Sequence, residues 1–384
     1  LAVGALWPTN AWDYPSFGLI LGGAIVLAAW RGARSEPVER KGSGTEEPGD
    51  ASDTGSDPPR GPSRARATLR ILLPASGWGL ALLGGSLLLF LPFHTTYVAP
   101  YGEFAAWRGY RTPPGSYLII HGLALAPIVS WACVRIARHA RSAGAAAAAR
   151  WLAPFVLGAT ALAVAGALWA RVATSSGAFP APSPITPALV ALLVGLGAAL
   201  LLLPGAAWPD RLAGGTLLVG ALLTGLVENV VLAGDIGRMN TVFKFYIHVW
   251  LIWAVTAGYC AGRVLDALSG RGGWATAWRV AFGLLLATGL LYTVTATRAK
   301  AQDRFEIRSE PDEPMSGPRP RPEPGLDGAA FLEWAVYDDV VPLRLAHDAE
   351  AFRWLRDHTE GTPTVLEAFR PHYRWGARYS IWTG

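Results

Sequence analysis

The long apolar runs of this chain constrain its fold more than any other feature, because most of them are long enough to cross a lipid bilayer. The runs are rich in Gly, Ala and Leu and lack the alternating pattern of a barrel strand. Backbone polar groups in lipid must be satisfied within their own segment, which a helix achieves. Eight spans are predicted, over residues 16–30, 69–93, 117–134, 151–170, 188–203, 216–233, 245–261 and 277–295. The predicted fold class is an all-α polytopic membrane protein.

The composition supports this class, because 52% of the residues are hydrophobic and only 16% are charged, unlike an ordinary soluble domain. Basic residues concentrate in the segment 31–68 and in the loops that follow residues 134, 203 and 261. The positive-inside rule then places the 31–68 linker in the cytoplasm and the carboxyl-terminal tail outside, with the chain in the plasma membrane. Since topology accounts for most of these charges, the net charge of +5 gives no reason to expect a nucleic-acid partner.

Changes of composition divide the chain into five regions. The linker is rich in Gly, Ser, Pro, Asp and Glu and is predicted to be disordered, because it cannot bury enough apolar surface to fold. A second linker is charged and proline-dense, which favours an extended backbone. The predicted regions are 1–30 (expected to be the end of a truncated helix, an external loop and the first span), 31–68 (cytoplasmic linker), 69–297 (helical bundle), 298–325 (Pro-rich linker) and 326–384 (expected to be a truncated external α/β domain).

The last region is predicted to begin an α/β domain. Asp348 is expected to cap a helix, and residues 364–368 and 378–382 are expected to form strands. Glu367 and Arg378 lie on these two predicted strands and are candidate binding residues, although such charges are most often surface or strand-edge groups.

The strongest candidate site is the segment 234–250, GDIGRMNTVFKFYIHVW, at the mouth of a predicted span. Its polar residues are Asp235, Arg238, Asn240, Lys244 and His248. Charged groups near hydrocarbon are costly, so a cluster of them indicates a site. Arg and Lys beside a helix start suit an anionic group such as phosphate. The alternative is that these charges cap helix ends and pair with one another at the headgroup level.

Glu228 lies inside the predicted span 216–233, where an ionisable side chain usually faces the bundle interior. Its predicted partner is either Arg238 or His248. On the same predicted side, Asn10 and Asp13 either contribute to the site or only cap the first span. His121 and His248 are most simply read as histidines whose hydrogen bonds are satisfied near the membrane surface, because no metal or triad spacing surrounds them.

The motif RMNTVFKFY at residues 238–246, followed by Trp250, resembles the hallmark of the uncharacterised polytopic family labelled Chlor_Arch_YYY. TNAWDYP at 9–15 and RYSIWTG at 378–384 agree with it, so the resemblance spans nearly the whole chain. Members of this family are similar in layout to GT-C integral-membrane glycosyltransferases, which have many helices and an external active site.

The resemblance implies a lipid-linked (polyprenyl-phosphate) sugar donor and contact with membrane lipid. Arg238 and Lys244 would hold the phosphate and stabilise the charge that builds on it as the glycosidic bond breaks. A carboxylate would deprotonate the acceptor hydroxyl, or support or bind a metal there, so a divalent cation is compatible with the mechanism. The catalytic candidates are Asp13, Glu228 and Asp235, and the other substrate-binding candidates are Asn10, Asn240, Tyr246, His248, Glu367 and Arg378.

The competing interpretation is a transporter or lipid flippase, in which Glu228, His248 and Arg238 form a substrate or proton relay. Alternating access needs polar groups near the midplane and on both sides of the membrane. The concentration of polar residues toward one predicted side favours the enzyme.

Overall fold

The structure is a computed structural model that describes residues 2–9, 13–35, 64–97, 103–173, 182–232, 237–305, 327–333, 335–338, 342–371 and 374–384. The chain divides into two compact units, Leu1–Ala287 and Thr288–Gly384, which are considered separately below. Most of the described residues are helical, which confirms the predicted helical class.

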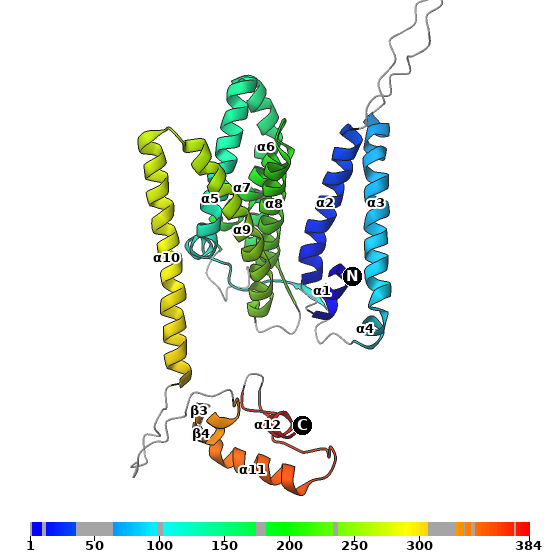
Figure 1. The fold of residues 1–384 in the computed structure, drawn as a ribbon, viewed down its shortest axis with the longest axis vertical. Coiled ribbons are helices and arrows are strands. Elements are labelled where there is room, and N and C mark those ends of the chain that lie inside the picture. Colours follow the sequence, from blue (N-terminus) through cyan, green and yellow to red (C-terminus); the bar gives the residue numbers. More distant parts are fainter. Residues whose placement is uncertain are drawn as a thin grey trace, which may run out of the picture. The chain divides into compact units, whose positions relative to one another are not determined.

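Ten helices occupy the described part of the chain up to residue 305 (Figure 1). They are α1 (Ala2–Thr9), α2 (Asp13–Ser35), α3 (Arg64–Leu89), α4 (Leu91–Thr96), α5 (Pro114–Ala143), α6 (Ala145–Ala173), α7 (Ile185–Leu202), α8 (Trp208–Asn229), α9 (Met239–Leu268) and α10 (Gly272–Phe305). Among the described residues, the six helices α5 to α10 are long and apolar enough to cross a membrane. Helices α2 and α3 contain shorter apolar stretches, so the count of eight spans stays a prediction.

Several predicted boundaries differ from the structure. Helix α8 ends at Asn229, earlier than predicted, because the next three residues form strand β2 (Val230–Leu232). Helix α9 begins at Met239, six residues before the predicted start at 245, so part of the polar motif is helical. The linkers are also shorter than predicted, since α2, α3 and α10 extend into them. Residues 36–63 and 306–325 lie outside the described residues.

Helices α5, α7, α8 and α9 pack around the main hydrophobic core, in which Trp131 and Trp253 are among the largest fully buried side chains. The most extensive helix contact joins α7 to α8. Glycine makes it close, because a Cβ added at Gly214 would lie only 2.4 Å from the backbone nitrogen of Leu201. Small residues allow membrane helices to approach at this distance.

A short antiparallel strand pair joins the segment before α5 to the end of α8. Strand β1 (Phe104–Ala106) pairs with β2, with Ala106 opposite Val230. The pairing continues into a hydrogen bond of 2.9 Å from the Trp107 amide to the Asn229 carbonyl. The segment before α5 is therefore held against the end of α8, although the two are far apart in the sequence.

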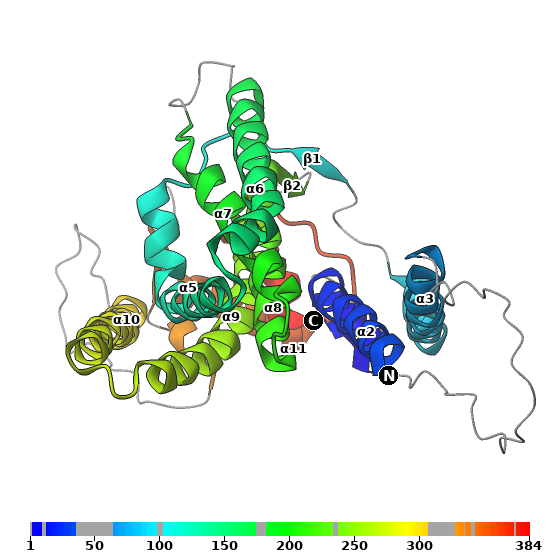
Figure 2. The ribbon, with the colours of Figure 1, turned by 90° about the horizontal axis from the view of Figure 1, so that it is seen from above.

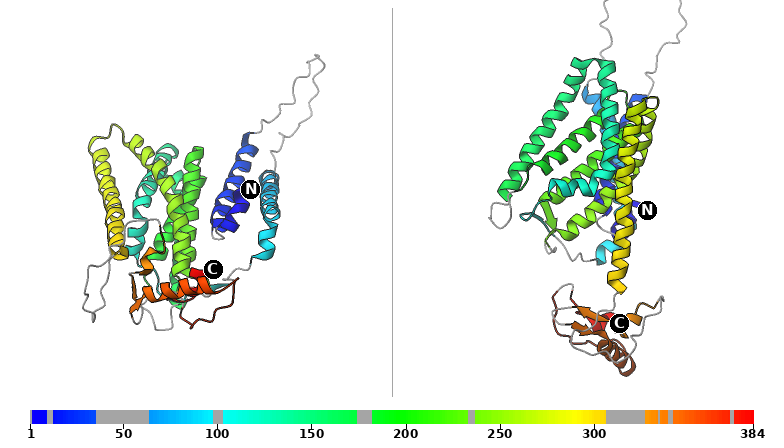
Figure 3. Two further views of the ribbon diagram at one scale, coloured as in Figure 1. Left: turned by 60° about the horizontal axis from the view of Figure 1, so that its bottom comes forward. Right: turned by 90° about the vertical axis from the view of Figure 1, so that its left-hand side faces the viewer.

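Helix α2 connects the amino-terminal helices to the bundle. It packs beside α3, and its other side contacts α8 and α9, as the view from above shows (Figure 2). The Tyr14 hydroxyl lies 3.0 Å from the Ser86 hydroxyl, which joins α2 to α3. Figure 3 shows these helices and those of the bundle from two further sides.

The second unit contains a small cluster of short elements. They are the 3-10 helix η1 (Ala330–Glu333), strands β3 (Val336–Asp338) and β4 (Pro342–Arg344), and helices α11 (Leu345–His358) and α12 (Arg378–Thr383). Strands β3 and β4 form an antiparallel hairpin. Leu332, Leu345, Ala349 and Phe352 form the buried core of the unit.

The strand predictions for this unit are wrong. Residues 364–368 form no strand, and Leu366 among them is 98% exposed, so no neighbouring layer buries it. Residues 378–382 are helical, because Ala377 adopts a left-handed conformation that starts α12 and Trp382 packs on Phe352. Asp348 is not the helix cap either: Arg344 occupies that position, and Asp348 lies in the first turn of α11.

Candidate functional site

A buried ion pair lies where α8 ends and α9 begins. Arg238 Nη1 is 2.8 Å from Glu228 Oε1, and both side chains are only 11% exposed. Arg238 also donates to the Val227 carbonyl and to the Thr112 hydroxyl oxygen, each at 2.9 Å. Of the two partners predicted for Glu228, the structure shows Arg238.

The segment before α5 supplies further groups to this pair. Thr112 donates to Glu228 from its amide at 3.1 Å and from its hydroxyl at 2.5 Å. Arg111 donates to Asn229 Oδ1 at 3.2 Å and to the Trp107 carbonyl at 2.9 Å. We call Arg111, Thr112, Glu228, Asn229 and Arg238 the Glu228 cluster.

The Glu228 cluster carries a net positive charge, because it holds two guanidinium groups and one carboxylate. Burial lowers the pKa of Arg111, the Glu228 carboxylate raises it, and Arg238 lowers it further, so the pKa lies below its ordinary value. Because the ordinary pKa of arginine is far above neutral, the guanidinium remains protonated at neutral pH. The cluster therefore attracts anions.

A cavity of about 450 Å³ opens beside the Glu228 cluster, between α6, α7 and α8. Arg111, Glu228 and Asn229 line one part of it. Arg111 is only 8% exposed, and among the described residues its Nε has no hydrogen-bond partner. The other walls are mostly apolar and include Leu162, Val190, Val194, Leu222 and Leu226. The cavity thus combines a charged end, lined by the Arg111 guanidinium and the Glu228 carboxylate, with mostly hydrocarbon walls, which suits an amphipathic ligand.

A second polar contact joins α2 to α9. His248 Nε2 donates to the Asp13 carboxylate, and the Ser16 hydroxyl lies 2.8 Å from His248 Nδ1. Ser16 and His248 are buried, whereas the Asp13 side chain is 24% exposed. Both ring nitrogens of His248 are therefore satisfied, as predicted, but its partner is Asp13 and not Glu228.

The prediction for His121 is wrong, because neither of its ring nitrogens has a hydrogen-bond partner among the described residues. It is 1% exposed and is enclosed by the rings of Tyr117, Tyr246 and Trp253. Tyr246, a predicted substrate-binding residue, is also buried and faces this histidine. The imidazole of His121 and the hydroxyl of Tyr246 therefore place two polar groups inside the bundle.

Sequence analysis missed a buried carboxylate at the opposite end of α8. Asp210 is 2% exposed and accepts hydrogen bonds from Trp131 Nε1 at 2.7 Å and from the Tyr259 hydroxyl at 2.8 Å. Arg135 Nε lies 2.9 Å from its second oxygen. The adjacent Asp and Arg in WPDRL, directly before a long apolar run, were the available signal.

The remaining predicted residues are distributed as follows. Asn240 and Lys244 lie near the start of α9 and are partly buried. Asn10 and Asp235 lie outside the described residues. Within the part of the chain that the structure describes, no three His, Cys, Asp or Glu side chains gather as metal ligands.

Glu367 and Arg378 contact each other in the second unit, at 3.2 Å. Arg378 also pairs with Asp348 at 3.1 Å, and Trp375 Nε1 donates to Asp348 at 2.7 Å. Burial alone lowers the pKa of Arg378, but Asp348 and Glu367 together outweigh it, so the pKa is raised. These contacts hold α12 to α11.

These observations define a polytopic helical membrane protein with a buried ionic cluster beside an amphipathic cavity. The chain belongs to the family described as uncharacterized membrane protein (DUF2298), whose family model matches residues 1–253. The matched region contains the whole Glu228 cluster and the Asp13–His248 contact. No curated protein and no solved structure matches the chain.

Proposed function

We propose that this chain is a membrane glycosyltransferase that uses a lipid-linked (polyprenyl-phosphate) sugar donor at the external face. The proposal is in line with the resemblance to the Chlor_Arch_YYY family and to GT-C enzymes. The observation that carries it is the cavity in which Arg111 and Glu228 border hydrocarbon walls. A lipid with a phosphate near its polar end matches both parts of that cavity.

In the proposed reaction, the acceptor hydroxyl oxygen attacks the anomeric carbon of the sugar. The bond from that carbon to the phosphate oxygen breaks, the lipid phosphate leaves with the electron pair, and a carboxylate takes the hydroxyl proton. Arg111 lines the cavity and stabilises the leaving phosphate directly, whereas Lys244, near the start of α9, does not line the cavity and contributes its positive charge from outside it. Arg238 has a different role, because its bonds to Glu228, Val227 and Thr112 commit it to holding the carboxylate in place.

One observation favours the alternative of a transporter or flippase. Buried or partly buried polar groups are found along α8, since Asp210 lies at one end, Glu228 at the other, and the partly buried Thr216 hydroxyl lies 2.8 Å from the Thr256 hydroxyl between them. Transporters need polar groups at several depths. Asp210 does not line the amphipathic cavity, so the enzyme remains the better supported function.

The test is sugar transfer from a polyprenyl-phosphate donor in vesicles that contain the full-length protein. Lys244→Ala should lower the transfer rate by on the order of 10²-fold, the effect of removing one electrostatic stabiliser. Arg263→Ala is the matched control, because it removes a cation from the other end of the same helix, 44% exposed. Arg238→Ala is less informative, since it leaves Glu228 buried without its ion-pair partner.

Wild-type transfer by Lys244→Ala would contradict the phosphate role. Export of a labelled lipid or solute without any transfer product would instead support the transporter. Protease protection, which measures membrane insertion, should be the same for the wild-type protein, Lys244→Ala and Arg263→Ala.

A further inference from the structure

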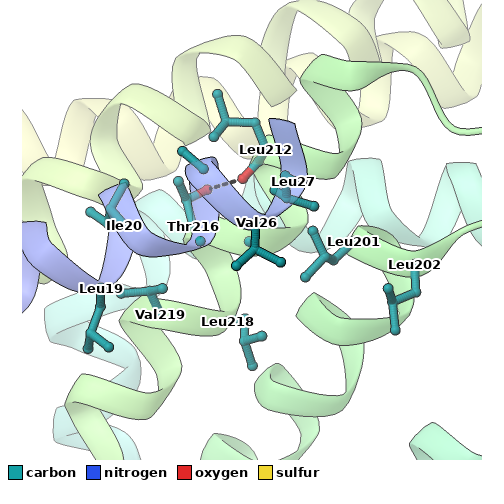
Figure 4. Close-up of a pocket in the computed structure, with 13 residues that line it drawn as sticks. Leu19, Ile20, Val26, Leu27, Leu201, Leu202, Leu212, Thr216, Leu218 and Val219 are labelled. Carbon is teal, nitrogen blue, oxygen red and sulfur yellow. Dashed lines mark hydrogen bonds between the residues drawn. The ribbon is translucent and has the colours of Figure 1, made fainter. Parts of the chain in front are cut away.

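A second cavity of about 430 Å³ lies between α2, α7 and α8 (Figure 4). Leucine and valine side chains from all three helices point into it, among them Leu19, Val26, Leu201, Leu212 and Val219. The hydroxyl in its wall belongs to Thr216, which donates to the Leu212 carbonyl at 3.0 Å. The cavity therefore offers an apolar surface only.

The two cavities lie one after the other along α8. Leu19 lines both of them, so they meet at this residue of α2. On α8, the apolar cavity extends from Leu212 to Val219 and the amphipathic cavity from Leu222 to Asn229. At 1.5 Å rise per residue, this path is about 26 Å long.

The length of this path restricts the ligand. A bilayer has a hydrocarbon core of about 30 Å, so one leaflet contributes about 15 Å. An ordinary phospholipid whose phosphate sits at Arg111 ends its acyl chains near the midplane. It would fill the amphipathic cavity and leave the end at Leu212 empty.

We propose that the two cavities bind a single long-chain polyprenyl phosphate, with the phosphate at Arg111 and the chain along α8 as far as Leu212. The net positive charge of the Glu228 cluster, of which Arg111 lines the amphipathic cavity, selects the phosphate. The apolar cavity selects the long chain. The inference rests on the proposed function for the sugar that this lipid carries, but binding of the lipid itself requires no transfer.

The test measures binding of undecaprenyl phosphate and of the short-chain farnesyl phosphate to the full-length protein in nanodiscs. Gly23 lines the apolar cavity, and a Cβ added there meets no atom within 4 Å, so Gly23→Phe fills the cavity without a backbone clash. Gly22→Phe is the matched control: its Cβ position is equally open, and Gly22 lines neither cavity.

The wild-type protein should bind undecaprenyl phosphate at least about tenfold more tightly than farnesyl phosphate, a difference that binding assays resolve readily. Gly23→Phe should remove this preference without weakening farnesyl phosphate, and Gly22→Phe should keep it. Arg111→Gln should weaken both lipids. If Arg111→Gln does not fold, the Gly22 and Gly23 pair still decides the outcome.

Equal affinity for the two chain lengths in the wild-type protein, or displacement by an equal amount of phosphatidylglycerol, would overturn the inference. The experiments can reject the proposed function and the lipid site independently of each other. Chain-length preference that Gly23→Phe abolishes, in a protein that transfers no sugar, supports the lipid site and rejects the transferase. A rate of sugar transfer that depends neither on the chain length of the lipid donor nor on Gly23→Phe supports the transferase and rejects this site.

Discussion

The two ends of α8 each bury a carboxylate beside an arginine, yet their surroundings differ. Asp210 is enclosed by Trp131, Tyr259 and Arg135 and lines neither of the two bundle cavities. Glu228 is bonded to Thr112 and Arg238 but also lines the amphipathic cavity. A carboxylate that is completely surrounded by donors stabilises packing, whereas one that borders a cavity can meet a ligand. Burial alone therefore does not distinguish structure from function.

The contact between α7 and α8 is also closer near Asp210 than near Glu228. Near Asp210, a Cβ at Gly214 would lie 2.4 Å from the backbone of α7. Near Glu228, a Cβ at Gly225 would meet only a side-chain carbon of Val190, at 3.2 Å. The Asp210 end is tightly closed, while the Glu228 end leaves room for the cavity.

The largest expected effect comes from Asp210→Ala. Removing one partner from a buried ion pair should cost about 3–5 kcal/mol, because Arg135 loses its ion-pair partner and Trp131 and Tyr259 lose their acceptor. Thermal unfolding of the detergent-solubilised protein measures the loss. Glu228→Gln, which keeps an oxygen for Thr112, should be less destabilising and should reduce transfer instead.

The distinction between a structural Asp210 and a functional Glu228 is contradicted if Glu228→Gln unfolds as readily as Asp210→Ala and the fraction that folds transfers sugar at the wild-type rate. It also fails if Asp210→Ala folds normally and loses transfer.

The apolar helices were predictable because hydropathy depends only on neighbouring residues. The partner of Glu228 was among the two predicted because only ten residues separate it from Arg238. Arg111 was not predicted as a site residue. Its place depends on the pairing of Ala106 with Val230, a contact between segments more than a hundred residues apart. No local pattern encodes such a pairing.

Asp210 was missed for a different reason. The predicted span begins at residue 216, which leaves Asp210 in the predicted loop, whereas α8 begins at Trp208 and places it on the inner face. The strand predictions at 364–368 and 378–382 failed because β-branched and aromatic residues form a strand only where a neighbouring strand can pair with them.

A smaller effect is expected from glycine substitution. Gly214→Ala should destabilise the protein by about 3 kcal/mol, since the added carbon meets rigid backbone and forces α7 and α8 apart. Gly225→Ala should cost less, because the Val190 side chain can move into the cavity. Thermal unfolding measures the loss of stability in both variants. Gly215→Ala is the control, because a Cβ at Gly215 would lie 3.8 Å from Leu201 Cδ1, an ordinary van der Waals distance. Equal losses for Gly214→Ala and Gly225→Ala would mean that the two ends are equally closed.

The smallest effects are expected from removing one tyrosine hydroxyl near each end. Tyr259 donates to the charged Asp210, so Tyr259→Phe should cost about 1.5 kcal/mol. The Tyr117 hydroxyl donates to Thr224, whose own hydroxyl bonds the Ala221 carbonyl, so Tyr117→Phe should cost about 1 kcal/mol or less. Thermal unfolding of both variants, with the double variant to test additivity, measures the difference. Because the hydroxyls lie in separate networks, the two losses should add; a clear excess in the double variant would show that the two ends of α8 are energetically coupled, which the closed and open ends described here do not predict.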